Sequence, residues 1–284
     1  MADKNVIELI KALRERTGAG MMDCKRALEA NGMDIEKSVD YLREKGIAKQ
    51  ARRANRTAAE GLTNVAICEK CGKAVILEIN CETDFVSASD KFKSLVASVT
   101  DTLFEKEPKT IEEAKAITTQ EFQDAALAVG EKLDFRRFAI VSKKPEEGFG
   151  SYIHMGGKIS VVVVFAKADE EIAKPIAMHI AANNPLYVNL EDVPAADRAR
   201  EKAIAEQEVK DDPKLMAKPD QVKAMIVERK VDKVLSQSCL ALQPYLMDES
   251  ESVGEFLKGK GNSVVSFVRY QVGDGIVKDP SQAN

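Results

Sequence analysis

The predicted order of strands and helices occurs twice along the chain, and this repetition constrains the fold more than any other sequence feature. Strand-period residues and a glycine turn predict a β-hairpin over residues 62–79, followed by helices and a strand at 135–142. A second hairpin at 150–165 is followed by a helix and a closing strand at 263–272. The equivalent turns are Gly72-Lys73 and Gly157-Lys158. We therefore expect an α+β fold with two related core subdomains, each with a three-stranded antiparallel sheet.

Residues 1–55 have a helical period instead. Apolar residues recur at helical spacing in three stretches, and glycine-rich segments end the first two. Asp34 is suited to cap the third helix, which is predicted to end at Gly46. The basic segment 49–56 has almost no large apolar residue and is interpreted as a tether. The pattern predicts a small three-helix domain followed by a basic linker.

An insertion rich in Ala, Glu, Lys and Arg interrupts the second subdomain. Residues 191–235, broken by Pro213, predict an antiparallel helical hairpin. A protruding hairpin has few neighbours, so its apolar stripe is expected to pack against another molecule, such as a second copy of the chain. A hairpin with a charged, solvated surface is an equally good interpretation. The stripe consists of Ile204, Met216, Val222, Met225, Ile226, Val231 and Val234.

The predicted domain boundaries follow from these patterns. They give a three-helix domain and linker at 1–55, core subdomains at 56–145 and at 146–190 with 236–275, the helical hairpin at 191–235, and a short tail at 276–284. The helix of the second subdomain contains Pro175, which has no N–H to donate. That helix is therefore expected to start late or to kink.

Charge and hydropathy exclude several classes of function. The net charge is -4 and the pI is near 5.6, so the chain lacks the broad attraction on which phosphate-backbone binders depend. No apolar run approaches the ~18 residues that span a bilayer. Residues 1–4 lack a secretory pattern. We expect no direct nucleic-acid ligand, no membrane association and a cytoplasmic location.

The chain has five cysteines, an odd number that favours reduced thiols over a disulfide framework. Cys68 and Cys71 form a Cys-x-x-Cys pair at a hairpin turn, and Cys81 follows ten residues later. A zinc or thiol-redox site at these three cysteines is the alternative function. Zinc needs four ligands, however, and no nearby histidine or second pair completes the set. Cys24 and Cys239 are expected to be small buried side chains.

Residues suited to catalysis are scarce. The two histidines are His154, at a predicted hairpin tip where surface contacts are usual, and His179, on an apolar helix where packing is usual. The segment Gly18-Ala19-Gly20 separates two helices and lacks the Lys-Ser/Thr ending of a phosphate-binding loop. We therefore expect no cofactor, no metal and no enzymatic activity.

Two segments point to a protein partner. Thr83, Asp84, Phe85 and Val86 follow a buried strand and precede a helix that Ser87 or Ser89 caps. Such connections run over the surface, where a large ring beside a carboxylate is costly unless it is used. Met21 and Met22 lie beside the first glycine turn and either fill the three-helix core or face a partner.

Three separated stretches resemble one known family. They are Leu13-Arg14-Glu15-Arg16-Thr17-Gly18-Ala19-Gly20-Met21-Met22-Asp23-Cys24-Lys25, Glu82-Thr83-Asp84-Phe85-Val86 and Ile176-Ala177-Met178-His179-Ile180-Ala181-Ala182. In this order and over nearly the whole chain, they resemble the bacterial elongation factor Ts family, the guanine-nucleotide exchange factors of elongation factor Tu.

The resemblance implies a ubiquitin-associated-like (UBA-like) N-terminal domain, two related core subdomains and a helical hairpin used in dimerisation. It implies that Thr83, Asp84, Phe85 and Val86 enter elongation factor Tu in its GDP form and displace Mg²⁺, so that GDP leaves and GTP can bind. It also implies further partner contacts, which map onto Arg14, Met21, Met22 and His154.

Some features depart from the family pattern. Cys68, Cys71 and Pro175 do not belong to it, and the chain ends soon after Lys278, where some members continue into a helix that touches the partner. That contact is expected to be missing. Besides the thiol or zinc alternative, the three-helix domain with its basic tether remains open to interpretation as an RNA-binding or ubiquitin-like recognition module.

Overall fold

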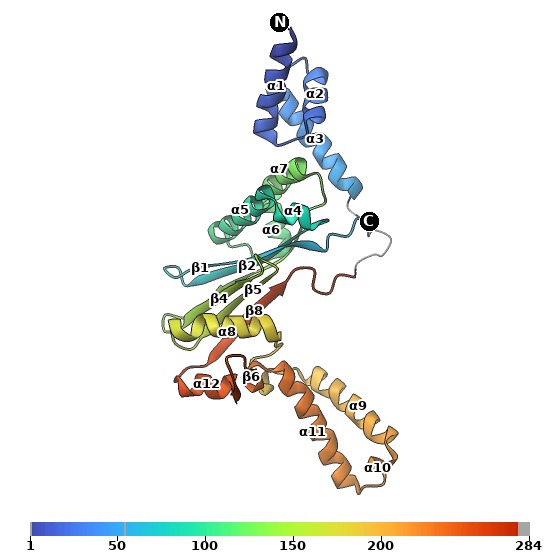
Figure 1. The fold of residues 1–284 in the computed structure, drawn as a ribbon, viewed down its shortest axis with the longest axis vertical. Coiled ribbons are helices and arrows are strands. Elements are labelled where there is room, and N and C mark those ends of the chain that lie inside the picture. Colours follow the sequence, from blue (N-terminus) through green and yellow to red (C-terminus); the bar gives the residue numbers. More distant parts are fainter. Residues whose placement is uncertain (1, 54, 278–284) are drawn as a thin grey trace. The chain divides into compact units, whose positions relative to one another are not determined.

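The computed structural model describes residues 2–53 and 55–277, and the chain divides into two compact units. One unit comprises Met1–Ser142, Ile153–Ser160 and Tyr270–Asn284, and the other comprises Lys143–Tyr152 and Val161–Arg269. Figure 1 shows the elements of both units. The expected tail at 276–284 lies outside the described residues from 278 onward.

The three N-terminal helices are α1 (Ala2–Thr17), α2 (Met21–Ala30) and α3 (Ile35–Arg53). Their buried core consists of Ile10, Leu13, Ala19, Cys24, Ala27, Leu28, Val39 and Leu42. The predicted end of the third helix at Gly46 is wrong, because α3 continues to Arg53. Gly46 lies inside the helix, next to Leu127 of another helix, and this packing outweighs the low helix propensity of glycine. Most of the expected tether is therefore helical.

The first sheet has the order β1-β2-β3, built from β1 (Glu60–Cys68), β2 (Lys73–Cys81) and β3 (Asp134–Ser142). All neighbours are antiparallel, and the central β2 is buried from Ala74 to Cys81. Four helices lie on one side of this sheet, namely α4 (Asp84–Ala88), α5 (Asp90–Lys106), α6 (Ile111–Ile117) and α7 (Thr119–Val129) (Figure 1). Thr118 separates α6 from α7.

A buried carboxylate ties the end of the chain to the first sheet. Glu78, with no exposed surface, pairs with Arg136 (Oε1–Nη1, 2.9 Å) and Arg137 (Oε2–Nε, 2.6 Å). Its Oε1 also accepts a hydrogen bond from Gly273 N at 2.8 Å. The guanidinium group of Arg137 lies over the ring of Tyr270, 4.3 Å from its centroid. One acid therefore connects β2, β3 and the segment after the last strand.

The second sheet has the order β4-β5-β8, built from β4 (Gly148–His154), β5 (Ile159–Phe165) and β8 (Val264–Gln271). In each of the two three-stranded sheets, the second strand of a β-hairpin lies at the centre, which confirms the repeat predicted from the sequence. Helix α8 (Glu170–Asn183) packs closely on β4, since a Cβ at Gly150 would lie 2.6 Å from the carbonyl oxygen of Ala173. The predicted late start of this helix is wrong, because α8 begins at Glu170 and Pro175 lies inside it.

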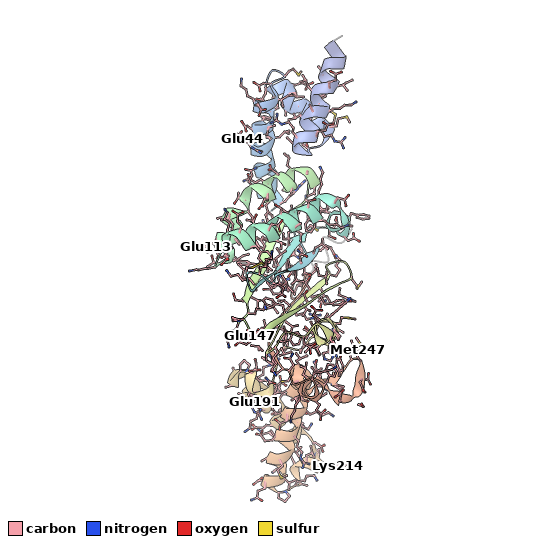
Figure 2. All side chains as sticks on the ribbon, turned by 90° about the vertical axis from the view of Figure 1, so that its left-hand side faces the viewer. Glu44, Glu113, Glu147, Glu191, Lys214 and Met247 are labelled. Atoms are coloured by element: carbon pink, nitrogen blue, oxygen red, sulfur yellow. A yellow bond between two sulfur atoms is a disulfide. The ribbon has the colours of Figure 1, made fainter. Side chains whose placement is uncertain are left out.

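The insertion is a helical hairpin, as expected. A short 3₁₀ turn, η1 (Leu190–Asp192), leads into α9 (Ala195–Asp211), and α10 (Pro213–Met216) turns the chain into α11 (Asp220–Ser238). Lys214 lies at the tip of the hairpin (Figure 2). The helices bury Ala205, Val209, Val227, Val231 and Leu235 between them.

The predicted apolar stripe of this hairpin divides into two sets. Val231 is buried in the hairpin core and Ile226 packs against it. The exposed members are Ile204, Met216, Val222, Met225 and Val234. Met225 and Val234 lie nine residues apart, about two and a half turns at 3.6 residues per turn, and so occupy opposite faces of α11. These side chains therefore do not form one continuous stripe.

The sequence did not predict the elements between the hairpin and the last strand. These are η2 (Leu240–Leu242), a small β6–β7 hairpin (Pro244–Tyr245 and Asp248–Ser252) and α12 (Val253–Gly259). The start of α12 has a readable signal, because Ser252 and Glu255 form a capping box. Strands of two and five residues carry too little periodicity to be recognised.

The cysteines differ from the expectation of five reduced thiols. Cys68 and Cys71 are joined by a disulfide, while Cys24, Cys81 and Cys239 are free and buried. Cys68 pairs with Lys73 at one end of the β1–β2 hairpin, and Cys81 pairs with Glu60 at the opposite end. A strand rise of about 3.4 Å per residue puts roughly 27 Å between the two ends. The proposed three-cysteine site is therefore wrong.

Within residues 2–53 and 55–277, no helix combines the length and apolar character needed to cross a membrane. In the same ranges, no group of three or more His, Cys, Asp or Glu side chains is arranged to hold a metal ion.

Candidate functional site

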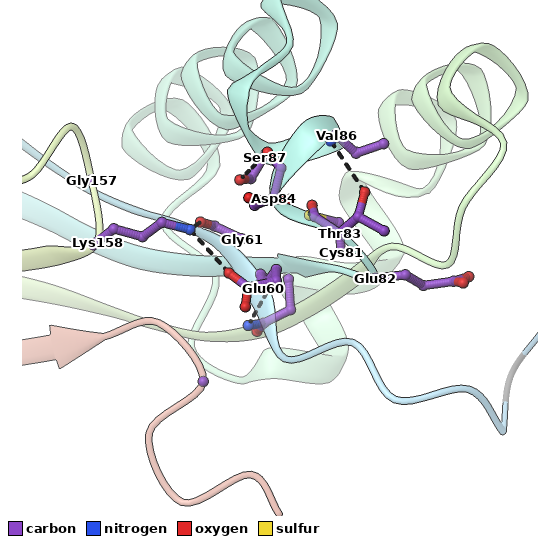
Figure 3. A network of polar contacts seen from close by, with 12 residues as sticks. Glu60, Gly61, Cys81, Glu82, Thr83, Asp84, Val86, Ser87, Gly157 and Lys158 are labelled. Carbon is purple, nitrogen blue, oxygen red and sulfur yellow. Dashed lines mark hydrogen bonds and ion pairs between the residues drawn. The ribbon is translucent and has the colours of Figure 1, made fainter. Parts of the chain in front are cut away.

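The Thr83–Val86 segment lies where the buried strand β2 ends and the short helix α4 begins. Thr83 has an extended backbone and caps α4, and its Oγ1 accepts a hydrogen bond from Val86 N at 3.4 Å (Figure 3). Ser89 then caps α5, and its Oγ accepts from Phe92 N at 3.3 Å. Threonine and serine at these two positions therefore turn the chain twice within seven residues, because each satisfies an otherwise unpaired N–H.

Glu131, just after the end of α7, anchors the base of this segment. Its Oε2 accepts hydrogen bonds from Glu82 N at 3.1 Å and from Thr83 N at 3.0 Å. Its Oε1 accepts from Thr83 Oγ1 at 2.6 Å. One carboxylate thus receives three donors from two consecutive residues, and such charge-assisted bonds are stronger than neutral ones.

Glu82 ties the same base to two further segments. Its Oε1 accepts from Lys132 N at 2.7 Å, and its Oε2 pairs with Arg56 Nη1 at 3.0 Å. Glu131 thus accepts from the backbone of Glu82 and Thr83, and Glu82 accepts from the backbone of Lys132, the residue after Glu131. The two residues that precede α4, Glu82 and Thr83, are therefore held in place by these contacts.

Above this fixed base, Phe85 points into solvent. Its side chain is 85% exposed, and Asp84 beside it is exposed as well. Val86, in contrast, packs against the core of the first sheet. An exposed phenylalanine on a short capped helix is an unpartnered apolar side chain next to a carboxylate.

Cys81 ends β2 next to the segment and is fully buried. Its Sγ donates to the carbonyl oxygen of Thr83 at 3.1 Å. Burial, with a smaller contribution from the charge of Glu131, raises the pKa of the Cys81 thiol to about 12. The thiolate is therefore not populated at neutral pH.

The tip of the β4–β5 hairpin lies against the first residues of β1. The Gly157 carbonyl oxygen accepts from Thr63 N at 2.7 Å and from Thr63 Oγ1 at 2.8 Å. Lys158 Nζ reaches Glu60 Oε2 and the Gly61 carbonyl oxygen, both at 3.2 Å (Figure 3). His154 ends β4 at this tip, as expected, and is half-buried. Met155 next to it is exposed.

The N-terminal residues singled out in the sequence are on the surface. Met21 and Met22 are 59% and 61% exposed in the first turn of α2, so the interpretation that both fill the helical core is wrong. Arg14 is exposed on α1.

Gly18, in the loop between α1 and α2, lies next to α5 and α7. Its carbonyl oxygen accepts from Lys91 Nζ at 3.3 Å, and a Cβ at its positive φ of 67° would lie 2.8 Å from the Cβ of Ala128. Only glycine combines this φ with so close an approach.

The arrangement is suited to binding a partner. Among the described residues, no group of three or more His, Cys, Asp or Glu side chains around the segment is arranged to hold a metal ion. The segment has an exposed aromatic ring and an exposed carboxylate, and hydrogen bonds hold its base in place. Sequence reasoning found the ring and the carboxylate but missed Glu131 and Lys91, because no local pattern links them to Thr83 or Gly18, which lie 48 and 73 residues away.

Comparison with known proteins points to a single family. A family model described as Elongation factor TS matches residues 82–274. A protein from Lactiplantibacillus plantarum named Elongation factor Ts is 44% identical over 275 residues, which cover 95% of this chain and 92% of the relative. Another of the same name from Levilactobacillus brevis is 42% identical over 285 residues, covering 98% of this chain and 95% of the relative.

Proposed function

This chain belongs to the elongation factor Ts family, and from that membership we propose that it binds the GDP form of elongation factor Tu and accelerates the release of GDP. The family consists of nucleotide exchange factors of translation, which are not enzymes in the usual sense. The observation that supports the proposal best is the exposed ring of Phe85 on a segment with a fixed base. Translation in bacteria takes place in the cytoplasm, where we expect the protein to act.

We assign the displacing role to Thr83, Asp84, Phe85 and Val86. The Phe85 ring and the Asp84 carboxylate enter the nucleotide-binding domain of the partner, while Thr83 and Val86 hold them in position. Mg²⁺ in a GTPase bridges the nucleotide phosphates and requires near-ideal octahedral ligands. A small shift of a supporting element therefore expels the ion, and GDP loses its main counter-charge.

The energetics require more than one side chain. Burying a phenylalanine contributes roughly 1.5–3 kcal/mol. A ~10⁴-fold weakening of GDP binding requires about 5.5 kcal/mol. The rest must come from a wider interface, to which we assign Arg14, Met21, Met22 and His154. All four are exposed or half-buried and belong to the same unit as Phe85.

Reciprocity completes the cycle. If the exchange factor weakens GDP binding by some factor, GDP weakens the binding of the exchange factor by the same factor. Incoming nucleotide therefore ejects the factor, which is free to act on another molecule of elongation factor Tu.

Replacement of Phe85 by alanine tests the proposal directly. Because the ring makes little contact with its own core, Phe85→Ala is expected to fold with unchanged thermal stability. Release of labelled GDP from elongation factor Tu should slow by roughly tenfold or more, the equivalent of 1.5 kcal/mol or more in lost burial. Stopped-flow fluorescence of a GDP analogue measures this rate.

The matched control is Ile117→Ala, which removes an exposed apolar side chain from α6 of the same unit. It should leave GDP release unchanged. Wild-type release rates in Phe85→Ala would exclude the insertion of this ring. Absence of stimulation by the wild-type chain would exclude the function itself.

We also propose that two chains associate through the helical hairpin. Met216, Val222 and Met225 are exposed near its tip, on α10 and the first turns of α11. The buried contacts between α9 and α11 do not use these side chains, so they remain available to a second copy.

A further inference from the structure

The Cys68–Cys71 pair is not used by the proposed exchange function. It lies in the turn between β1 and β2, about 27 Å of strand away from the segment that carries Phe85. Its two sulfur atoms are the only ones among the cysteines of this chain to be bonded to each other, and all five cysteines fall within the described residues.

The backbone of the turn brings the two residues together. Cys68 pairs with Lys73 in the last rung of the hairpin, so four residues, Glu69 to Gly72, make the return. Gly72 takes a positive φ of 63°, which favours glycine. The Cα atoms of Cys68 and Cys71 are 5.5 Å apart, within the usual range for a disulfide. The two thiols are therefore held within bonding reach by the sheet itself.

The turn also distinguishes the two sulfur atoms. The backbone N–H of Cys71 points at Cys68 Sγ, with an N–S distance of 3.3 Å. A donor aimed at sulfur stabilises the negative charge of a thiolate. Cys71 Sγ has the opposite kind of neighbour, the carbonyl oxygen of Cys68 at 3.4 Å. Cys68 is therefore the better nucleophile and Cys71 the resolving thiol.

Accessibility separates this pair from the other three cysteines. Cys71 is exposed and Cys68 is half-buried, with exposed Glu69 and Lys70 between them. Cys24, Cys81 and Cys239 are fully buried, and burial raises the pKa of each of these thiols. Oxidants in solution therefore reach one pair and not the remaining thiols.

We propose that Cys68 and Cys71 form a reversible modification site that takes up two oxidising equivalents from a peroxide and returns them to a dithiol. The Cys68 thiolate attacks the peroxide, the O–O bond breaks, and a sulfenic acid and hydroxide form. The Cys71 thiolate then attacks the sulfenic sulfur, the S–S bond forms and a second hydroxide leaves. Two thiols and one hydrogen peroxide thus give one disulfide and two waters, with the thiol protons taken up by the hydroxides. A dithiol reverses the change by exchange and becomes a disulfide itself.

Titration of the reduced full-length chain with equimolar hydrogen peroxide tests the site. We expect two of the five thiols to disappear in a denaturing thiol assay, and the intact mass to fall by two hydrogen atoms. Peptide mapping should place the new bond within one peptide that contains both cysteines. Dithiothreitol should restore both thiols.

Serine variants assign the roles. Cys71→Ser should accumulate a sulfenic acid at Cys68 that dimedone traps, whereas Cys68→Ser should react about tenfold more slowly, because the thiolate fraction controls the rate. The double variant Cys68→Ser/Cys71→Ser is the matched control. It keeps the buried thiols and should lose none of them under the same dose.

Three results would overturn the proposal. Unchanged thiol counts in the wild type would show that peroxide does not oxidise the pair. Equal thiol loss in the double variant would transfer the reaction to other cysteines. Stoichiometric zinc in the purified reduced chain, retained through gel filtration with a chelator, would assign the pair to metal binding.

Discussion

Glu131 is the residue on which the position of the exposed segment depends most. Its carboxylate accepts hydrogen bonds from two backbone amides and one hydroxyl at the base of α4. Without it, these three donors lose the carboxylate that accepts from them, and Phe85 loses a fixed support. A segment ordered in advance binds at a smaller entropic cost than a mobile one.

We therefore predict that Glu131→Ala slows GDP release from elongation factor Tu although residue 131 carries none of the displacing groups. A loss of about 1 kcal/mol in preorganisation corresponds to roughly a fivefold lower rate. Unfolding free energy should fall by about 1–3 kcal/mol, because partly buried donors lose their partner. Nucleotide-release kinetics and urea unfolding measure the two effects.

Hydrogen exchange provides the structural readout for this variant, since the amides of Thr83 and Val86 should exchange faster. Glu112→Ala, which removes an exposed acid from the first turn of α6, is the control and should change neither rate. Slower release with unchanged amide protection would contradict the anchoring role.

Glu78 is a residue of the opposite kind, important for stability and distant from the exposed ring. Because it is fully buried between Arg136 and Arg137, its removal leaves two cations without their partner. We predict that Glu78→Ala lowers the free energy of unfolding by roughly 3 kcal/mol, near the lower end for a broken buried pair. The arginines remain partly exposed and regain water, which limits the loss.

Glu107→Ala is the comparison for this prediction. It breaks an ion pair with Lys73 in which the acid is about half exposed, so the loss should stay below about 1 kcal/mol. Equal losses in the two variants, measured by denaturant unfolding, would contradict the assignment of stability to burial of Glu78.

At the scale of elements, His179 connects α8 to the β6–β7 hairpin. Its Nε2 lies 2.9 Å from Gln243 Oε1, and its Nδ1 accepts a hydrogen bond from Leu246 N at 3.2 Å. The amide of Asn183 lies 3.2 Å from the ring, and the ring of Tyr245 is 6.2 Å away between centroids. The expected packing role is consistent with these contacts. The neutral ring donates on one side and accepts on the other.

This geometry predicts a pH dependence. Burial lowers the pKa of His179 from the ordinary value of 6.5, while the hydrogen bond to Gln243 partly opposes the shift. The unfolded chain therefore binds the proton more tightly than the folded chain. The contribution to stability is fully present above pH 6.5 and is lost as the pH falls from 6.5 to the folded pKa, by at most about 1.4 kcal/mol per pH unit.

Urea unfolding of the wild type and of His179→Gln between pH 7.5 and pH 5, roughly the range in which histidine titrates, checks this prediction. The wild type should lose stability below pH 6.5, and the variant should show a smaller slope there. Parallel curves for the two proteins would mean that another group carries the dependence.

At the scale of the whole molecule, the proposed association of two chains depends on the helical hairpin. We predict that Met225→Asp lowers self-association, because it places a carboxylate one helical turn from exposed Val222 while leaving the α9–α11 contacts intact. Sedimentation equilibrium should show at least a tenfold weaker dimer, which corresponds to about 1.4 kcal/mol.

Val234→Asp is the matched control for this variant. Val234 is exposed on the same helix but on the opposite face from Met225, about two and a half turns away. It should dimerise like the wild type. A monomeric wild type at all concentrations, or equal effects of the two substitutions, would exclude the proposed tip contact.

The sequence by itself determined the elements and their repeated order. Helical and strand periods, glycine turns and serine or threonine caps are local properties, so the two hairpins, the N-terminal helices and the helical hairpin could be read directly. The Thr83–Val86 segment was recognisable for the same reason, because its composition is unusual for a surface connection. Local signals failed where packing outweighed them, as at Gly46, or where strands were too short, as in β6 and β7.

Only the tertiary structure decided which of these residues meet. Glu131 and Thr83 lie 48 residues apart, and Gly273 and Glu78 lie 195 apart. Val231 and Met225 read alike in the sequence, yet one is buried in the hairpin and the other is exposed. A period specifies which face of an element is apolar, whereas the partner of a given side chain depends on how distant elements pack. For that reason the exposed ring could be anticipated from the chain, but the acid that holds its base could not.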